Sequence, residues 1–454
     1  MQKKKFLIIF LIFILTRFLI YFYFNIEPVG KIFHHWQLLD KELLHHDLLK
    51  SILYLHTQPF LWNLFIGCLT KIFNGNEIYI SNFLLLYHLS LTIIFIYLIN
   101  KIITFYYLSN FKIYIINLFI IFNPGIIFFE NLPLYAHTVF FLFSLTIFFS
   151  FFYFRDKKSK YLALFYLCLL ILTFIWSAFS PILLILVFIV FKLISNDNKK
   201  IQKIFFVFFF LISILPTLKN YIIFKNISSS FIGYNLAMHV NPYIESGQCS
   251  LSPSPIREGD ENNYIKYHNK NFKIKHPSIS GQLSRYNNVG MIYRSNICKS
   301  ITIDFLKENP FIFTKILFTE FISLHGKWLI DFAIIEHPKG WDKIYQKTQD
   351  IYKNDILKKI KQLINILFIF FIYFYFVKKI IAFYKKKINR KYLIITLLLL
   401  FYIIGVGTIF SKYEGERFFY SGYIIIVLFL IEFFSKDNYL EKTLKKTTLS
   451  TLKS

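Results

Sequence analysis

The stretch NIEPVGKIFHHWQLLDKELLHHDLLKSILYLHTQPFLW occupies residues 25–62 and separates the first apolar run of the chain from all the later ones. It is polar where its neighbours are apolar, and it ends in His56-Thr57-Gln58-Pro59. Its acidic residues are Glu27, Asp40, Glu42 and Asp47. Because a polar segment of this kind does not lie in hydrocarbon, we interpret it as a loop on one side of a membrane and expect it to hold the active site.

The composition sets the class of protein. Hydrophobic residues make up 56% of the chain, and Phe alone accounts for 58 of the 454 residues. Charged residues are confined to blocks between uncharged apolar runs, which predicts an all-α, polytopic integral membrane protein and excludes a soluble one. The net charge of +27 gives no reason to expect nucleic acid as a partner.

Ten apolar runs are predicted to be transmembrane helices, at a rise of about 1.5 Å per residue and a hydrocarbon thickness of about 30 Å. They are residues 6–24, 78–99, 113–129, 138–154, 161–178, 181–194, 205–218, 363–377, 392–410 and 418–434. Residues 59–73 are apolar too, but Lys71 and the turn Asn74-Gly75-Asn76 end the run early, so we expect an interfacial helix there.

The basic blocks, such as residues 3–5 and 155–160, fall on one side of these spans, which predicts cytoplasmic N and C termini. We expect three parts. Residues 1–220 form an N-terminal transmembrane module, residues 221–361 a large extracytoplasmic region, and residues 362–454 the last three helices and a basic tail. The expected location is the bacterial inner membrane, or the endoplasmic reticulum if the chain is eukaryotic.

Several polar residues stand out against the apolar background. Arg17 lies inside the first span, where a charge is costly, and is expected to snorkel, to pair with a neighbouring helix or to be functional. Glu130 opens a polar segment that runs to His137 at the expected membrane surface, and its alternative role is an outer turn with Asn131 and Pro133. The motif Gly405-x-Gly407 is expected to allow close helix packing.

Cysteine and histidine spacing predicts no metal site. The pairs His34-His35 and His45-His46 are more typical of solvated loops than of ligands, and a divalent cation as cofactor stays open. Cys249 and Cys298 both fall in the extracytoplasmic region, where an oxidising compartment permits a disulfide. The sequence leaves open whether they pair.

The order of these features resembles the GT-C superfamily of membrane glycosyltransferases, closest to the branch of protein O-mannosyltransferases and aminoarabinose transferases of lipid A. The resemblance rests on an acidic first outer loop ending in His56-Thr57-Gln58-Pro59, on Asn123-Pro124-Gly125 leading to Glu130, and on Glu414-Gly415-Glu416-Arg417 before the final helix. It implies a GT-C-like fold. It also implies that a sugar moves from a polyprenyl-phosphate-linked donor to a hydroxyl of a glycan, lipid or protein acceptor.

The resemblance also implies which side chains act. The candidate catalytic residues are Asp40, Glu42, Asp47 and Glu130, and the candidate substrate-binding residues are His56, Gln58, His137 and Arg417. Asp40-Lys41-Glu42 is the nearest match to the family's Asp-x-Asp-like pair. The transfer needs a base for the acceptor hydroxyl and a cation for the departing phosphate, and we expect Asp40 and Arg417 in these roles.

Other interpretations stay open. If residues 32–55 form one helix, Asp40 and Asp47 share a face, Glu42 points nearly opposite, and the acids only solvate an interfacial helix. Arg417 is equally suited to a local ion pair with Glu414 or Glu416. The alternative function is a lipid-linked sugar translocase or another membrane transporter, and a receptor-like or assembly protein with a passive outer domain is a third.

Overall fold

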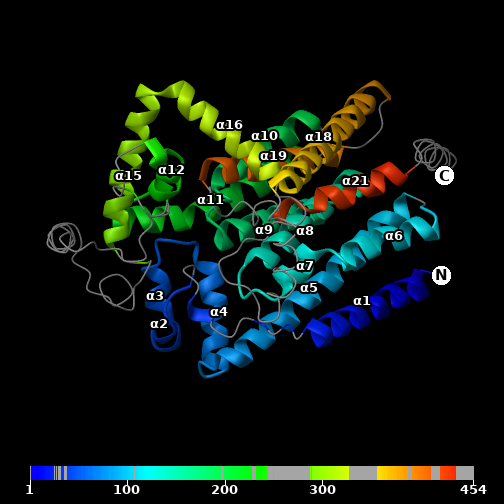
Figure 1. The fold of residues 1–454 in the computed structure, drawn as a ribbon, viewed down its shortest axis with the longest axis horizontal. Coiled ribbons are helices and arrows are strands. Elements are labelled where there is room, and N and C mark those ends of the chain that lie inside the picture. The colour runs from blue at the N-terminus through cyan, green and yellow to red at the C-terminus, as the bar shows by residue number, and fades with distance from the viewer. Residues whose placement is uncertain are drawn as a thin grey trace.

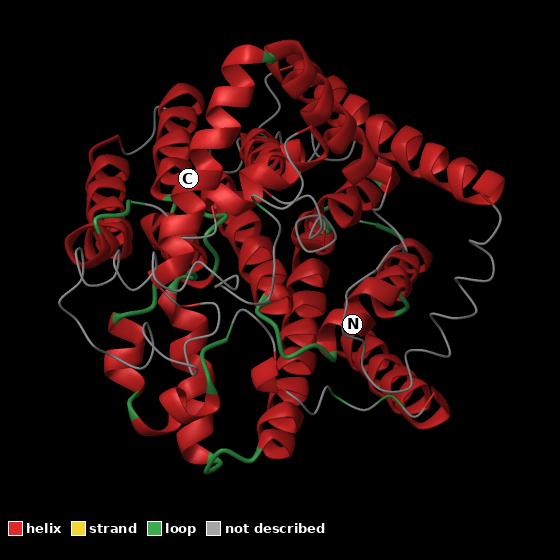
Figure 2. Cartoon of the chain, turned by 60° about the vertical axis from the view of Figure 1, so that its left-hand side comes forward, coloured by secondary structure: helices red, strands yellow, loops and turns green. Residues whose placement is uncertain are grey.

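In a computed structural model of the chain, the described residues are 2–24, 26, 28, 32–34, 38–106, 108–195, 199–227, 232–243, 249, 287, 289–326, 355–386, 391–410 and 420–435. Figure 2 shows that this part of the chain consists of helices joined by loops, with no strand. The prediction of an all-α fold is confirmed.

Six helices in the described ranges are long and apolar enough to cross a membrane. They are α1 (Gln2–Phe24), α5 (Glu77–Phe105), α8 (Ala136–Asp156), α11 (Lys199–Phe224), α18 (Asp355–Lys386) and α19 (Lys391–Phe410). A seventh span results if α6 (Asn110–Ile121) and α7 (Pro124–Glu130), which bend by 47° at their junction, count as one. The chain is therefore a multi-pass α-helical membrane protein.

Three of the ten predicted spans form shorter apolar helices. These are α9 (Ser159–Ile175), α10 (Pro181–Ile194) and the last helix, of which α21 covers Ile424–Phe434. The 14 residues of α10 extend about 21 Å, less than a hydrocarbon core of about 30 Å. The number of ten spans stays a prediction. The expected interfacial helix is α4 (Phe60–Ile72), which is also short.

The centre of the bundle is α8. In its apolar segment 83% of the residues are buried by other helices, against 17% for α1 and for α11. The helices α5, α9 and α19 pack directly on α8. The helices α1 and α11 thus lie at the periphery, where their large exposed apolar side chains face lipid in a membrane protein.

Two local sequence signals position the helices that carry the candidate site. At Asn74-Gly75, φ angles of 49° and 71° make the predicted turn, and the side chain of Asn76 then caps α5 by accepting from the backbone N–H groups of Ile78 and Tyr79. Asn123 caps α7 in the same way, with Pro124 in the first turn. The break before Pro124 bends α7 away from α6 and sets the position of Glu130 at the end of α7.

Side-chain contacts define one end of the bundle, which we call the Glu432 end because Glu432 of the last helix accepts a hydrogen bond there from the Tyr106 hydroxyl. There the Lys5 ammonium bonds to Asn110, the Lys112 ammonium donates to the Phe434 carbonyl oxygen (3.0 Å), and the Arg155 guanidinium lies 3.8 Å from the Phe105 ring centroid. The opposite end, which we call the Glu130 end, carries the short helices α2 (Lys41–His46), α3 (Leu48–Leu53) and α4 (Figure 1).

The described part of residues 221–361 contains α12 (Ile232–Val240), η2 (Asn241–Tyr243), α15 (Val289–Glu308) and α16 (Pro310–Gly326). A disulfide joins Cys249 and Cys298, whose Cα atoms are 5.7 Å apart, and answers the question that the sequence left open.

Gly233 on α12 lies so close to α15 that a Cβ atom would be 1.8 Å from the Ser295 carbonyl oxygen. A Cβ at Gly405, in contrast, meets no described atom within 4 Å, so the expected close packing at that glycine is absent from the described structure.

Candidate functional site

The opening loop, residues 25–62, folds into η1 (Ile32–His34) followed by α2 and α3. Asp40 is the N-cap of α2, and its Oδ1 atom accepts a hydrogen bond of 3.0 Å from the Glu42 backbone N–H. Asp47 lies in the break between α2 and α3. The loop is thus not one continuous helix, and the seven-residue spacing of Asp40 and Asp47 does not place them on a common helical face.

The acids of the opening loop differ in exposure. Glu42 is exposed, whereas Asp40 and Asp47 are partly buried. The second carboxylate oxygen of Asp40 makes no hydrogen bond within the described structure, so it remains available to a substrate. The backbone before Asp40 is fixed, because the Leu39 N–H donates to Oδ1 of the buried Asn63 on α4 at 2.8 Å.

His56 and its neighbours attach the loop to the rest of the protein. The His56 backbone N–H donates to Asn287 Oδ1 (2.9 Å), and the imidazole Nε2 lies 2.8 Å from the Asn287 carbonyl oxygen. A carbonyl only accepts, so Nε2 carries the proton. The Lys219 ammonium also donates to the Leu55 carbonyl. We call this group of residues, His56, Asn287, Lys219 and Leu55, the loop anchor.

Burial lowers the pKa of His56 to about 3; the charge of Lys219 acts in the same direction, and the hydrogen bond to Asn287 opposes it. His56 is therefore neutral at neutral pH. Gln58, two residues on, is half-buried, and its Oε1 atom has no hydrogen-bond partner in the described structure. Of these two predicted substrate-binding residues, His56 is engaged with protein and Gln58 keeps a free acceptor.

Two of the most buried charged residues of the described chain are Arg17 on α1 and Glu130 on α7. The guanidinium Nε lies 2.6 Å from Glu130 Oε2 and Nη2 lies 3.1 Å from Oε1, a two-pronged pair. The Arg17 Nη1 also donates to the Ile121 carbonyl oxygen at 2.7 Å. The two side chains are 3% and 0% exposed. Arg17 thus pairs with a neighbouring helix instead of snorkelling, and the Glu130 side chain lies inside the helix bundle.

A chain of hydrogen bonds extends from this ion pair. The Thr92 hydroxyl on α5 donates to Glu130 Oε1 at 2.7 Å and lies 3.1 Å from Nε2 of His137 on α8. The same Nε2 lies 3.1 Å from the His88 carbonyl oxygen, so it carries the proton. Nδ1 of His137 then accepts from the Tyr420 hydroxyl at 2.5 Å. Two predicted site residues, Glu130 and His137, are therefore joined through Thr92.

His88 and Trp62 lie beside this network. The His88 Nδ1 atom is 3.1 Å from the Glu130 carbonyl oxygen and therefore carries the proton, which leaves Nε2 as an acceptor. The His88 and Trp62 rings are nearly parallel, at 8°, with centroids 6.5 Å apart. Within the described structure neither His88 Nε2 nor Trp62 Nε1 has a hydrogen-bond partner. Buried polar groups without partners are uncommon, so each of these two atoms is notable.

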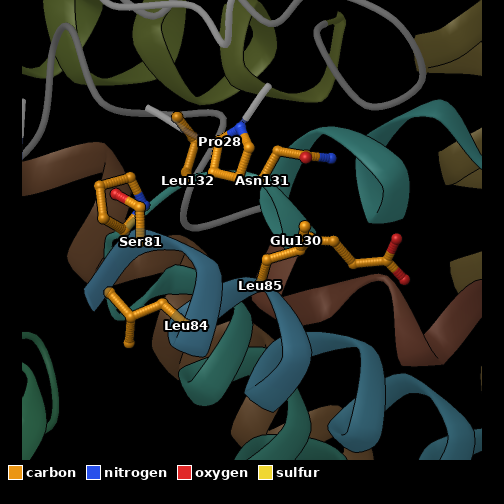
Figure 3. Close-up of a pocket in the computed structure, with 8 residues that line it drawn as sticks. Pro28, Ser81, Leu84, Leu85, Glu130, Asn131 and Leu132 are labelled. Atoms are coloured by element: carbon orange, nitrogen blue, oxygen red, sulfur yellow. The ribbon is translucent and has the colours of Figure 1, made fainter. Parts of the chain in front are cut away.

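A narrow crevice, without room for a water-sized sphere, adjoins the network. Figure 3 shows it between Ser81, Leu84 and Leu85 of α5 and the turn after α7, with the Glu130 carboxylate pointing away from Ser81. The crevice therefore meets the backbone of Glu130, to which His88 is hydrogen-bonded.

The structure brings the predicted residues into two groups and leaves one undescribed. Asp40, Glu42 and Asp47 stay on the opening loop, while Glu130 and His137 lie in the helix bundle. Arg417 lies outside the described residues. The residues that the sequence did not single out are Trp62, His88, Thr92 and Tyr420. The signal for His88 was available, because it is a lone histidine within an otherwise apolar span.

No three His, Cys, Asp or Glu side chains of the described ranges are grouped as metal ligands. The neighbouring His45 and His46 contact each other edge to face at 4.5 Å, and His45 Nε2 bonds to Asn74 Oδ1 at 3.1 Å. Comparison of the chain with protein-family models, curated proteins and solved structures found no match in any of the three.

Proposed function

We propose that this chain is a membrane glycosyltransferase that moves a sugar from a polyprenyl-phosphate-linked donor to an acceptor hydroxyl. The observation that carries the proposal is the network of buried polar side chains at the Glu130 end of the helix bundle. Asp40 is tied through Leu39 and Asn63 to α4, and on α4 Trp62 lies against His88 of the Glu130 network. A lipid-linked donor needs this arrangement, with an apolar wall for the lipid and a polar site at its end.

The orientation that we propose puts the Glu130 end on the extracytoplasmic side. Lys5, Lys112 and Arg155 all lie at the Glu432 end, which suits the cytoplasmic face by the positive-inside rule. The disulfide between Cys249 and Cys298 suits an oxidising compartment for the region before the last helices. Both features agree with cytoplasmic termini and with transfer on the opposite side.

In the proposed reaction the acceptor hydroxyl oxygen forms a bond to the anomeric carbon while the bond from that carbon to the donor phosphate oxygen breaks. Asp40 takes the hydroxyl proton with its unbonded carboxylate oxygen, and the polyprenyl phosphate leaves as the anion. Arg417 is the proposed phosphate contact, since a guanidinium binds two oxygens at once. Glu130, paired with Arg17, is assigned to holding α1 and α7 in place and not to proton transfer.

The test is turnover of purified protein in nanodiscs against undecaprenyl-phosphate mannose, glucose and N-acetylglucosamine, with membrane extract as acceptor source. Wild type should release undecaprenyl phosphate and transfer sugar. Asp40→Asn should lose about 10²- to 10⁴-fold in rate, the range for removal of a general base. Asp304→Asn, an exposed acid of α15, is the control and should keep its rate. Equal rates for Asp40→Asn and wild type would remove the base assignment.

The second candidate is a lipid-linked sugar translocase. It is favoured by the burial of the Arg17–Glu130 ion pair inside the helix bundle, where the two side chains are 3% and 0% exposed. Ionisable groups inside such bundles often line transport paths. Passage of a lipid-linked sugar across sealed vesicles, without release of undecaprenyl phosphate, would select the translocase.

A further inference from the structure

The helices α15 and α16 follow each other in the chain but expose different kinds of side chains. The exposed charged residues of α15 are Lys299, Asp304, Lys307 and Glu308. In contrast, α16 exposes two phenylalanines, Phe311 at 89% and Phe318 at 64%. Aromatic side chains with this exposure are unfavourable in water, and neighbouring ones mark a surface that contacts something apolar.

The exposed phenylalanines belong to one face of α16. Phe311, Lys315 and Phe318 stand at positions i, i+4 and i+7, which fall within about 60° of each other around a helix. Elsewhere on α16, Phe313 is buried and Phe321 packs against the hydrophobic core of the bundle. The helix is therefore apolar on the side that meets the bundle and also on the side that does not.

The neighbours of α16 lie in the membrane. Figure 1 shows α16 running from the end of α15 to α18 and α19, and it packs directly on both. Both are long and apolar enough to cross a membrane, and α18 exposes Leu363, Leu367 and Phe374 along its apolar segment. Because α16 is attached to two such helices, lipid is the apolar medium nearest to its exposed face.

Lys315 limits how deep this face can lie. It is exposed between Phe311 and Phe318, and it has no ion-pair partner in the described part of the chain. An ammonium group is costly in the hydrocarbon centre, but its flexible stem can carry it to the phosphate groups of the lipids. Aromatic and basic residues together on a helix are typical of helices that lie in the headgroup layer.

We propose that α16 lies in the headgroup layer of the bilayer, with Phe311 and Phe318 between the lipid chains and the Lys315 ammonium at the phospholipid phosphates. The helix then ties α12 and α15, which the disulfide helps to hold, to the membrane surface. The partner is phospholipid. This inference goes beyond the proposed function and does not depend on it, because it concerns neither the sugar nor the reaction.

The test measures the surroundings of single labelled cysteines in the full chain, in nanodiscs of phosphatidylcholine and phosphatidylglycerol. Cys68→Ser removes the exposed free thiol, and the other free thiol, Cys168, is buried. In this background Phe311→Cys and Phe318→Cys each carry a bimane fluorophore on the exposed face. Two positions are used so that one folded variant is enough, and thermal unfolding in detergent establishes that each is folded.

Two matched variants calibrate the signal. Asp304→Cys, at an exposed position of α15, reports water, and Leu367→Cys, at an exposed position of α18, reports lipid. Iodide quenches a label in water, and a nitroxide on the phospholipid quenches a label in the bilayer. Iodide should quench the α16 labels at least about twofold less than the Asp304→Cys label, and a nitroxide near the headgroup should quench them more than one at the end of the acyl chain.

Three results would overturn the proposal. Iodide quenching of both α16 labels as strong as that of Asp304→Cys would place the face in water. Protection from iodide and from both nitroxides would mean that protein covers the face, from another segment of the chain or from a second copy. Quenching that is strongest from the end of the acyl chain, as at the bilayer centre, would contradict the headgroup position. Donor turnover plays no part in this measurement, so the proposed function stands or falls separately.

Discussion

Two glutamates are fully buried at opposite ends of the bundle, and they are held in different ways. Glu130 meets the guanidinium of Arg17 in a two-pronged ion pair. Glu432 accepts hydrogen bonds of 2.6 Å from the hydroxyl groups of both Tyr106 and Tyr392 on the same carboxylate oxygen. Each carboxylate joins three helices, α1, α5 and α7 in one case and α5, α19 and α21 in the other. The difference shows that one end depends on a specific positive charge and the other on hydroxyl donors.

The largest effect is expected where a charge loses its partner. Arg17→Met leaves Glu130 buried without its cation, and we expect a loss of about 3–5 kcal/mol in the free energy of unfolding. Denaturation in detergent, followed by helix content, measures it. The double variant Arg17→Met/Glu130→Leu removes both charges and should recover most of the loss, since apolar replacements of buried pairs are often neutral or stabilising.

A loss below about 1 kcal/mol in Arg17→Met would contradict the comparison, because it would mean that Glu130 needs no cation. An equal loss in the single and double variants would assign the effect to lost packing of the arginine side chain, whose guanidinium carbon lies 4.7 Å from the Phe13 ring centroid. Leu11→Met, at an exposed position of α1, is a matched control for the substituted side chain.

The Glu432 end is expected to respond less. Tyr106→Phe removes one of the two hydroxyl donors and leaves the ring in place, at a cost of about 1.5–3 kcal/mol for a hydrogen bond to a carboxylate. Tyr392→Phe should cost a similar amount. The same denaturation experiment measures both. Because the two hydroxyls bond to one oxygen and to each other, their double variant should lose less than the sum of the single losses.

A loss of about 3–5 kcal/mol in the free energy of unfolding for each tyrosine variant would mean that the two ends do not differ in this respect. Tyr97→Phe on the same helix gives a control, because Tyr97 is an exposed residue of α5. Its hydroxyl has no place in the cluster, and the variant should stay within about 0.5 kcal/mol of wild type.

The sequence predicts the membrane class and most helix positions, since the class follows from the apolar runs and the helix ends follow from turn and capping residues. Asn74-Gly75-Asn76 ends α4 and caps α5, and Asn123-Pro124 starts α7, as local residue preferences require. Span number is harder, because α10 has 14 residues and α9 has 17, and composition does not distinguish a short span from a buried helix.

The candidate site is predictable only in part, because local sequence patterns do not show which distant residues contact each other. Arg17 and Glu130 were both conspicuous as charges in apolar segments, yet nothing in the sequence pairs residues 113 positions apart. The depth of Glu130 follows from the bend of 47° between α6 and α7, which a run of apolar residues does not reveal. His88, Thr92 and Tyr420 enter the network only through this folding.

The smallest predicted effect is the pH dependence that His56 gives to the stability of the Glu130 end. His56 in the loop anchor has a pKa of about 3, lowered by burial from an ordinary value of 6.5, so between these values the unfolded chain binds a proton that the folded chain does not. Stability contributed by neutral His56 is complete above pH 6.5 and is lost as pH falls. From pH 6.5 to pH 5.5 the loss is about 1 kcal/mol. His56→Gln keeps a donor for the Asn287 carbonyl but does not titrate, so its stability should fall by about 1 kcal/mol less over this interval. If the free energy of unfolding varied with pH in the same way for wild type and His56→Gln, His56 would not be held neutral. The loop anchor would then contribute no pH dependence to the stability of the Glu130 end.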